Sequence, residues 1–403
     1  MRVLLVNAFH WLKGGVERTY LDESRWLAAA GHDVAHFAIR DPRNLPSPTA
    51  AHFAPPADFG ENAPLAAQLA TLPRALWSAP AARAMRGLLA AFTPDVAHVH
   101  APSRYLTPSV LRPLARAGVP IVHTLHDFKP WCTNRILYAH GEPCERCRGG
   151  RHWRAITTAC VQDSRAKSVV GAVEAYLHDA LGAWSGVRRW IAPSEFVRAK
   201  AASFGVPAAA LRVLAHGVEP LPPGDPPPGT PGRFVLFAGR LSAEKGVRLL
   251  PAIAAGVAPV PLLVAGEGPL AGWLDAQRTP GLLRLGHLAD PQLAALRAHA
   301  AVVIAPSLFV EHFGYAVAEA LLDARPVVAS RIGALPELVE HEVTGLLAPP
   351  GDAPAFASLV RRALGDPAAA AWGAAGSERV RQVADPAAHL ASLLSIYEEV
   401  TRR

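Results

Sequence analysis

Short apolar runs with the length of β-strands alternate along the chain with longer segments that have the length of helices. Residues 16–31 show the apolar spacing of a helix and end at Gly31, which is typical of a helix C-terminus. The predicted strands are 2–8, 32–39, 95–100, 119–127 and 189–194, and then 234–241, 261–268, 283–288, 301–307, 326–333 and 345–352. Strands that alternate with helices predict α/β domains, each with a doubly wound parallel sheet covered on both faces.

The alternation stops once, at a segment with seven prolines between residues 220 and 232. Proline donates no backbone hydrogen bond and cannot continue a helix, so this segment predicts a stiff, extended linker. A length of 403 residues also suggests two domains. We therefore expect two Rossmann-like domains that face each other across a cleft. The predicted units are 1–215, a hinge linker at 216–232, 233–384, and a C-terminal helix at 385–403 that packs back on the first domain.

The composition indicates extensive burial and a basic surface. Of the residues, 51% are hydrophobic and 18% are charged, and the net charge is +7. The arginines are spread along the chain, which fits a coding bias better than an anion-binding surface, and we expect no nucleic-acid partner. The N-terminus has no secretory pattern, and no apolar stretch is long enough to span a membrane. We expect a cytoplasmic protein, with contact to the inner face of the membrane as an open alternative.

Two cations follow the strand predicted at 234–241. Arg240 lies at its end, and Lys245 lies five residues later beside Gly246, where we expect a helix to begin. Charge-assisted donors beside a helix N-terminus suit a diphosphate. The alternative is a pair of solvated surface cations.

Two glutamates flank a Phe-Gly pair in an otherwise apolar stretch. Residues 301–307 predict a strand, 308–314 a loop, and 315–324 a helix, so Glu311 lies in the loop and Glu319 about one turn into the helix. Gly314 lets a ligand approach the free N–H groups of the helix. Burying a lone carboxylate is costly, which favours a function for both glutamates over a solvated surface position.

The pattern Glu311-x-Phe313-Gly314-x4-Glu319-Ala320 resembles the signature of glycosyltransferase family 4, also called group 1, whose members are retaining enzymes of the GT-B fold. The stretches 239–246, 266–270, 286–288 and 330–352 match this family in order and spacing. The first half resembles it more loosely, through Gly14-Gly15 and through 123–127. One departure is Ala334, where many members have a second glycine after Gly333.

The resemblance implies roles for individual residues. Arg240 and Lys245 would neutralise the donor diphosphate, Glu319 would bind the ribose, and Glu311 and His126 would lie at the transferred sugar, so that the implied catalytic residues are His126, Glu311, Arg240 and Lys245. The first domain would bind the acceptor and the second the donor. The implied donor-binding residues are Gly14, Gly15, Gly239, Arg240, Lys245, Gly266, Gly268, His287, Leu288, Phe313, Gly314, Tyr315, Ala316 and Glu319.

The implied activity is transfer of a sugar with retention from a UDP-, GDP- or dTDP-sugar to an acceptor hydroxyl on a glycan, a lipid-linked or a small-molecule acceptor. Two cations and two helix ends would stabilise the leaving diphosphate, so we expect no catalytic divalent metal. Two alternatives stay open: a nucleotide-sugar 2-epimerase of the same fold, and a non-catalytic nucleotide-sugar-binding module.

All four cysteines of the chain lie in the segment 131–161, which we treat as an insert in the first domain. They are Cys132, Cys144, Cys147 and Cys160. The spacing Cys144-x2-Cys147 is typical of a zinc site, although such sites usually have two pairs of this kind, and His140 and His152 are spare ligands. The hypotheses are a structural zinc ion, an iron–sulfur cluster, or unmetallated thiols.

Residues 74–92 combine arginines with apolar residues and Trp77. They fit a helix on an anionic membrane surface or a core-packed helix with arginines on its outer face, and Pro80 leads us to favour the second. His98, His100 and His123 alternate with apolar residues in predicted strands. We interpret them as hydrogen-bonded core or cleft-edge histidines rather than as metal ligands.

Overall fold

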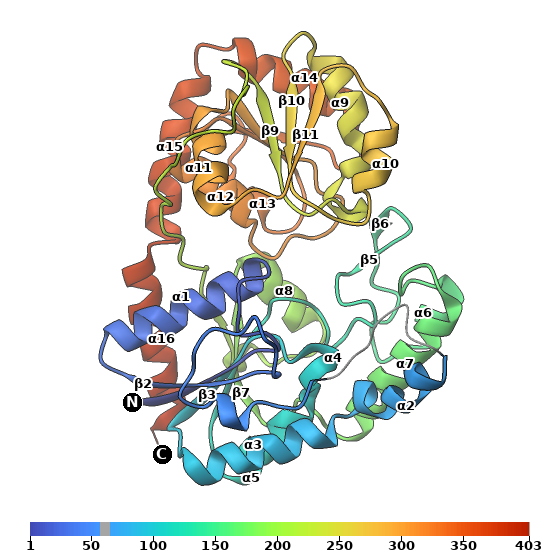
Figure 1. The fold of residues 1–403 in the computed structure, drawn as a ribbon, viewed down its shortest axis with the longest axis vertical. Coiled ribbons are helices and arrows are strands. Elements are labelled where there is room, and N and C mark those ends of the chain that lie inside the picture. The colour runs from blue at the N-terminus through green and yellow to red at the C-terminus, as the bar shows by residue number, and fades with distance from the viewer. Residues whose placement is uncertain (57–64, 403) are drawn as a thin grey trace.

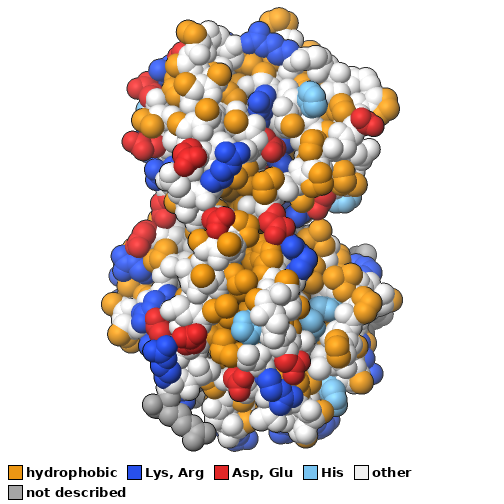
Figure 2. All heavy atoms as spheres, turned by 90° about the vertical axis from the view of Figure 1, so that its left-hand side faces the viewer, with side chains coloured by type: hydrophobic (Ala, Val, Ile, Leu, Met, Phe, Trp, Pro, Cys, Tyr) orange, Lys and Arg blue, Asp and Glu red, His pale blue; other side chains and the backbone are white. Residues whose placement is uncertain are grey.

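The chain forms two α/β domains stacked along the long axis of the molecule (Figure 1). The computed structural model describes residues 1–56 and 65–402. Figure 2 shows the two domains as separate bulges joined at a narrower waist. No described helix is both long and apolar enough to cross a membrane.

The N-terminal domain is built on a parallel sheet of six strands in the order β2-β1-β3-β4-β7-β8. Its strands are β1 (Arg2–Val6), β2 (Asp33–Phe37), β3 (Val96–Val99), β4 (Ile121–Thr124), β7 (Val187–Ala192) and β8 (Leu211–Val213). Its helices are α1 (Gly15–Ala29), α2 (Leu65–Leu76), α3 (Ala79–Ala91), α4 (Ser103–Leu106), α5 (Leu111–Arg116), α6 (Arg154–Thr158), α7 (Arg165–Ala180) and α8 (Glu195–Ser203). Apolar strand runs are buried here because helices cover both faces of the sheet.

The C-terminal domain repeats this design with the strand order β11-β10-β9-β12-β13-β14. Its strands are β9 (Val235–Ala238), β10 (Leu262–Ala265), β11 (Leu282–Gly286), β12 (Val302–Ala305), β13 (Val327–Ser330) and β14 (Leu346–Ala348). Its helices are α9 (Leu250–Val257), α10 (Ala271–Ala276), α11 (Asp290–His299), α12 (Tyr315–Leu322), α13 (Leu335–Leu338), α14 (Ala353–Gly365) and α15 (Ala369–Val383). Strand order reverses between β9 and β12, which pair in parallel with Val235 opposite Val302. Ligands of such sheets bind beyond this point of reversal.

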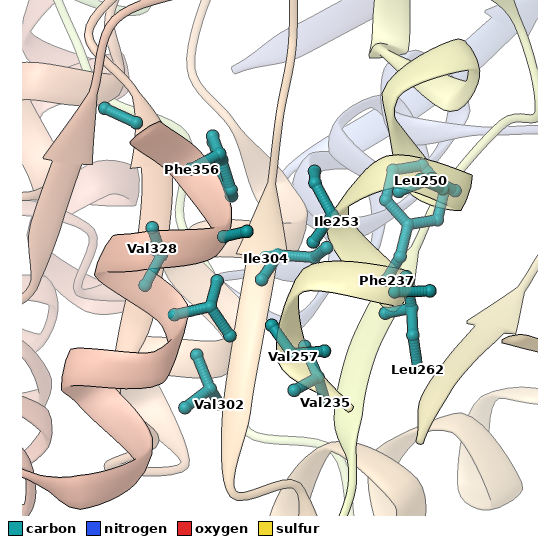
Figure 3. Close-up of a cluster of buried hydrophobic side chains, with 14 of the residues drawn as sticks. Val235, Phe237, Leu250, Ile253, Val257, Leu262, Val302, Ile304, Val328 and Phe356 are labelled. Carbon is teal, nitrogen blue, oxygen red and sulfur yellow. The ribbon is translucent and has the colours of Figure 1, made fainter. Parts of the chain in front are cut away.

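Each face of the C-terminal sheet has its own core. Figure 3 shows one of them, in which Val235, Ile304 and Val328 of the sheet meet Ile253 of α9 and Phe356 of α14. All five are at most 2% exposed. Burying one such side chain is worth about 2 kcal/mol, so these clusters hold the strand ends, and the loops after them, in place.

The chain crosses between the domains twice. The first crossing is the segment after β8, which has no helix or strand before β9, and the second lies between α15 and α16 (Pro386–Thr401). The crossings touch: the N–H of Val218 donates to the carbonyl of Ala384 at 2.9 Å, and a Cβ on Gly217 would lie 3.2 Å from the Cα of Pro386. Helix α16 then packs on the N-terminal sheet, where Leu393 and Tyr397 join a buried cluster with Val3 and Leu5.

The structure differs from the sequence prediction after β9. Lys245 does not open an α-helix as we expected: it ends a short 3-10 turn (Ala243–Lys245), and α9 begins only at Leu250. Gly246, with φ +75°, separates this turn from a second 3-10 turn (Val247–Leu249), which leads directly into α9. The cysteine segment has little regular structure, with α6 and a hairpin of two short antiparallel strands, β5 (Tyr138–Ala139) and β6 (Glu142–Pro143).

Candidate active site at the domain interface

Two segments predicted to bind the donor meet at the reversal point of the C-terminal sheet. The ammonium of Lys245, after β9, lies 2.7 Å from Oε1 of Glu311, in the loop after β12. Ser307 donates to the same oxygen at 2.6 Å. Glu311 is only 8% exposed, so these two donors replace the water that its carboxylate loses.

Glycines allow this close approach of backbone segments. Gly246 has φ +75°, and a Cβ there would lie 1.9 Å from the carbonyl oxygen of Pro306. Gly333 has φ +60°, and its Cβ would lie 2.4 Å from the N of Glu311. Ala334, the departure from the family pattern, has a right-handed conformation and donates its N–H to the carbonyl of Glu311 at 2.9 Å. Alanine therefore suffices at position 334, whereas position 333 requires glycine.

Helix α12 begins directly after this loop, with Gly314 at φ +98° as its N-cap residue. Phe313 is buried, and Tyr315 and Ala316 form the first turn of the helix. Glu319 lies in the next turn, where Nη1 of Arg297 contacts its Oε2 at 3.0 Å. Burial raises the pKa of Glu319, and Arg297 and then Arg18 partly offset this.

Cations from both domains lie near one another at the interface. Arg240 is exposed, and no described residue forms an ion pair with it. Burial lowers the pKa of Lys13, which precedes the Gly14-Gly15 turn, and among the nearby cations Arg43, Arg240 and Arg135 lower it further, against the opposing effect of Glu17. Two cations that repel each other across the interface make an environment that an anionic ligand would stabilise.

The Gly14-Gly15 turn touches the start of α12. A Cβ on Gly15 would lie 3.1 Å from the ring of Tyr315. The hydroxyls of Thr19 and Tyr315 are 2.6 Å apart, and Arg18 pairs with Asp290 at 2.7 Å. These contacts join the N-terminal part of α1 to the starts of α11 and α12.

The remaining glycines predicted to bind the donor pack against other backbone. A Cβ on Gly266 would lie 1.9 Å from the carbonyl oxygen of Gly239, and one on Gly268 would lie 2.4 Å from that of Leu241. These glycines let the turns after β9 and β10 pack closely together. This close packing alone explains glycine at positions 266 and 268. His287 is exposed and Leu288 half-buried, directly after β11 on the same edge of the sheet.

His126, after β4, belongs to a stack of rings that reaches the C-terminal domain. Its ring stacks on His216 at 5.2 Å, and His216 stacks on Tyr315 at 5.5 Å. Burial, with His216 and then His100 adding to it, lowers the pKa of His126. Burial likewise lowers the pKa of His216 to about 3. Both rings are therefore neutral at pH 7.

Behind His126 lies a fully buried polar network around Glu23 of α1. Nε2 of His126 is 3.0 Å from Nδ1 of His100, whose Nε2 lies 3.4 Å from the carboxylate of Glu23. His98 contacts the carboxylate at 3.1 Å and His389 of α16 at 3.2 Å. The prediction of hydrogen-bonded core histidines fits His98 and His123. It fits His100 only in part, because Nε2 of this ring is buried without a hydrogen-bond partner among the described residues. Although burial opposes ionisation, His98 and His100 lower the pKa of Glu23. Burial also opposes protonation of His389, but its hydrogen bond to Glu23 raises the pKa of that histidine.

Two groups of residues could hold a metal. Within the described ranges, Glu23, His98 and His100 are the only set whose ligand atoms all lie within 4.8 Å of one another. Both ring nitrogens of His98 are hydrogen-bonded, to Tyr397 and Thr124, whereas Oε2 of Glu23 and Nε2 of His100 have no hydrogen-bond partner among the described residues. The four cysteines are not joined by disulfides, and all four line one small cavity together with Trp131 and Phe204. His140 and His152 are not among its lining residues.

The family model "Glycosyltransferase Family 4" matches residues 13–220, and the model "Glycosyl transferases group 1" matches residues 232–366. The chain belongs to glycosyltransferase family 4. Within this family its N-terminal domain carries the Gly14-Gly15 turn, and its C-terminal domain carries Arg240, Lys245 and the two glutamates.

Curated relatives match part of the chain. A glycogen synthase of Mycobacterium tuberculosis is 36% identical over 178 residues, which are 41% of this chain and 43% of the relative. A D-inositol 3-phosphate glycosyltransferase of Pseudarthrobacter chlorophenolicus is 30% identical over 62% of this chain and 58% of its own length. The chain thus spans about half the length of the curated relatives it matches.

Solved structures show the same GT-B fold over the whole chain. The sucrose-phosphate synthase of Thermosynechococcus elongatus superposes with a TM-score of 0.70 over 99% of this chain and 98% of its own, at 22% identity. Anabaena HepE in complex with UDP and glucose superposes with a TM-score of 0.69, at 19% identity, over 99% of this chain and all of its own.

Four residues of the site were not predicted from the sequence. Lys13, Arg18, Arg297 and His216 lie outside the quoted family patterns. Lys13 carries a detectable signal, because it is one of five lysines and directly precedes the glycine pair. The other three act through contacts with Asp290, Glu319 and Tyr315, which are distant in sequence.

Proposed function

We propose that this chain is a glycosyltransferase that moves a sugar from a nucleoside diphosphate sugar to an acceptor hydroxyl with retention at the anomeric carbon. The observation that carries the proposal is the meeting of Lys245, Glu311 and the N-terminus of α12 at the reversal point of the C-terminal sheet. Arg240 lies two residues after β9 and has no ion-pair partner among the described residues. Anionic ligands bind where helix N-termini and cations combine.

In the proposed step the bond between the anomeric carbon and the diphosphate oxygen breaks, and a bond to the acceptor oxygen forms on the same face of the sugar. The acceptor proton passes to the leaving diphosphate. Negative charge grows on that diphosphate, where Arg240, Lys245 and the N–H groups of α12 would stabilise it. These groups can do so without a catalytic divalent metal.

The two glutamates would then hold neutral parts of the donor. Arg297 occupies Oε2 of Glu319, which leaves Oε1 to accept hydrogen bonds from the ribose. Glu311 is held by Lys245 and Ser307 at the mouth of α12, where it would face hydroxyls of the transferred sugar. His126, neutral and half-buried, would contact the sugar from the N-terminal domain.

A donor panel tests this proposal. UDP-, GDP- and dTDP-sugars are first screened for the one that raises the melting temperature, because a ligand that binds only the native state stabilises it. Release of nucleoside diphosphate is then measured with and without acceptors. We expect Arg240→Ala and Lys245→Ala to lower kcat about 100-fold or more, and Lys13→Ala to weaken donor binding about tenfold. Arg278→Ala, an exposed arginine in the loop before β11, is the control.

Each alternative has its own outcome. Release of an epimerised sugar without acceptor would identify a 2-epimerase, and binding without any turnover would identify a binding module. If Arg240→Ala and Lys245→Ala turn over like the unaltered chain, the site itself is misassigned.

We propose further that the cysteine segment holds a structural zinc ion through Cys132, Cys144, Cys147 and Cys160. The cavity between them has a volume of about 10 Å³, room for one small ion. Burial raises the pKa of Cys132 to about 12 and also raises that of Cys160, so that without a metal both thiols stay protonated. A zinc ion would instead bind thiolates, and the sulfurs would draw together around it.

The surroundings suit the charge of such a site. Zn²⁺ with four thiolates carries two negative charges, and segment 131–161 contains five arginines but only two glutamates. The segment has little regular structure, and small units of this kind usually need a metal or disulfides for stability.

Metal analysis of the purified chain tests the zinc site. We expect one zinc per chain, its loss in Cys144→Ser/Cys147→Ser, and its retention in the control His140→Asn. Four thiols that react rapidly without a chelator, or none that react under denaturing conditions, would overturn it in favour of free thiols or disulfides.

A further inference from the structure

A basic groove lies between α3 and α5, on the N-terminal domain. The groove has a volume of about 560 Å³. In Figure 1 these helices form the foot of the lower domain, on the side away from the C-terminal domain. Nothing in the proposed transfer reaction uses this surface.

Four arginines from two helices line the groove. Arg83 and Arg86 of α3 are three residues apart, and Arg112 and Arg116 of α5 are four residues apart, so each pair shares one face of its helix. All four are exposed, and within the described residues none forms an ion pair or a side-chain hydrogen bond. The groove lining contains no acidic residue, and the stretch 74–117 has six arginines against the single acid Asp95, which binds the N–H of Arg2.

On the face shown in Figure 2, charges of both signs are intermixed. Many arginines outside the groove are neutralised: Arg212 and Arg189, for example, both contact Glu399. Like charges that share one groove repel each other, and an anion relieves this cost. The positive charge of the groove therefore favours the binding of an anionic partner.

The floor of the groove is apolar. Helix α3 turns Ala81, Met85 and Leu88 into the core, as expected for a core-packed helix with arginines outside. The floor itself is formed by Trp77, Ala79, Ala82, Leu89, Ala90, Pro113 and Ala117. An apolar floor below a cationic rim matches an amphiphile with an anionic head, and tryptophan favours the boundary between lipid and water.

We propose that this groove binds the headgroup of an anionic phospholipid and thereby attaches the N-terminal domain to a membrane surface. The phosphate would lie among Arg83, Arg86, Arg112 and Arg116, and the glycerol and first methylenes against Trp77 and Leu89. A free phosphate would satisfy the arginines but would leave the apolar floor exposed. A membrane lipid thus accounts for both the arginine rim and the apolar floor of the groove.

Co-sedimentation with vesicles tests this proposal and does not require the sugar donor. We expect the full chain to bind vesicles that contain phosphatidylglycerol, not those of phosphatidylcholine alone, and to dissociate as salt rises. Arg83→Gln/Arg116→Gln should weaken binding about tenfold or more. Trp77→Ala should also weaken it, at unchanged net charge.

The control is Arg278→Gln/Arg381→Gln, which removes the same charge from exposed arginines of the C-terminal domain. Equal losses in both double variants would show that only net charge matters and would overturn the proposal. So would absent vesicle binding, or full displacement by millimolar glycerol phosphate, which would identify a soluble anion as the ligand. Circular dichroism of each variant shows whether a loss reflects unfolding.

Discussion

Individual side chains of the site are held in position by contacts with residues of other helices and strands. Glu23 holds the histidine next to His126 while it also contacts His389 of the last helix. Nδ1 of His100 and Nε2 of His126 lie 3.0 Å apart and share one hydrogen bond, in which one ring donates and the other accepts. The His126 nitrogen left for a ligand is then Nδ1.

This network predicts a pH-dependent contribution to stability. Because folding raises the pKa of His389, its interaction with Glu23 contributes fully to the free energy of unfolding below pH 6.5. This contribution is lost as the pH rises through the raised pKa. Because folding lowers the pKa of Glu23, its carboxylate contributes fully to the free energy of unfolding above pH 4.5. This contribution is lost as the pH falls through the lowered pKa. We expect Glu23→Gln to lower the free energy of unfolding by about 3 kcal/mol between these pH values, and by less at higher pH.

Urea unfolding of the unaltered chain and of Glu23→Gln, at pH 5.5 and at pH 9, measures this difference. A cost that is equal at both pH values would mean that Glu23 and His389 are not an ion pair.

At the scale of elements, glycine turns join loops that leave neighbouring strands. Gly333, after β13, lies against the backbone of Glu311 in the loop after β12. The loop that presents Glu311 is thus held from behind by the next turn.

Gly333→Ala should therefore lower the free energy of unfolding by about 3 kcal/mol, because a Cβ at φ +60° would also lie 2.4 Å from the N of Glu311. Gly229→Ala is the matched control: its φ is +79°, but nothing lies within 4 Å of its Cβ, so we expect a cost of about 1 kcal/mol. Thermal or urea melts of both variants give the comparison. Equal costs would mean that the Glu311 loop moves aside freely.

The order of strands and helices was predictable from the sequence because each apolar run is short, buried and bounded by turn residues. The positions of Lys245, Glu311 and Glu319 could be proposed because motifs carry them on adjacent strand ends. The bond from Arg297 to Glu319 and the ring stack from His126 to Tyr315 could not, since they depend on which helices pack side by side. The missing α-helix at Lys245 follows from Gly246, whose left-handed conformation ends the turn.

At the scale of the whole molecule, the two domains are held by a small number of polar contacts beside the site. The hydroxyl pair of Thr19 and Tyr315 and the ion pair of Arg18 and Asp290 lie close together. A third contact lies at the N-terminus of α8, where the N–H groups of Glu195 and Phe196 donate to the carboxylate of Glu337 at 2.9 and 2.7 Å.

A double-mutant cycle on Thr19→Val and Tyr315→Phe measures one of these contacts. We expect a coupling of about 1 kcal/mol in the free energy of unfolding, the usual net value of a hydrogen bond. A coupling near zero would mean that the domains spend most of their time separated at this point in solution.

The two crossings between the domains lie side by side, at Val218 and Ala384. A pair of covalent connections at one spot keeps the two domains close together there. Any opening of the interface would therefore move parts of the domains that lie far from this spot more than parts that lie near it.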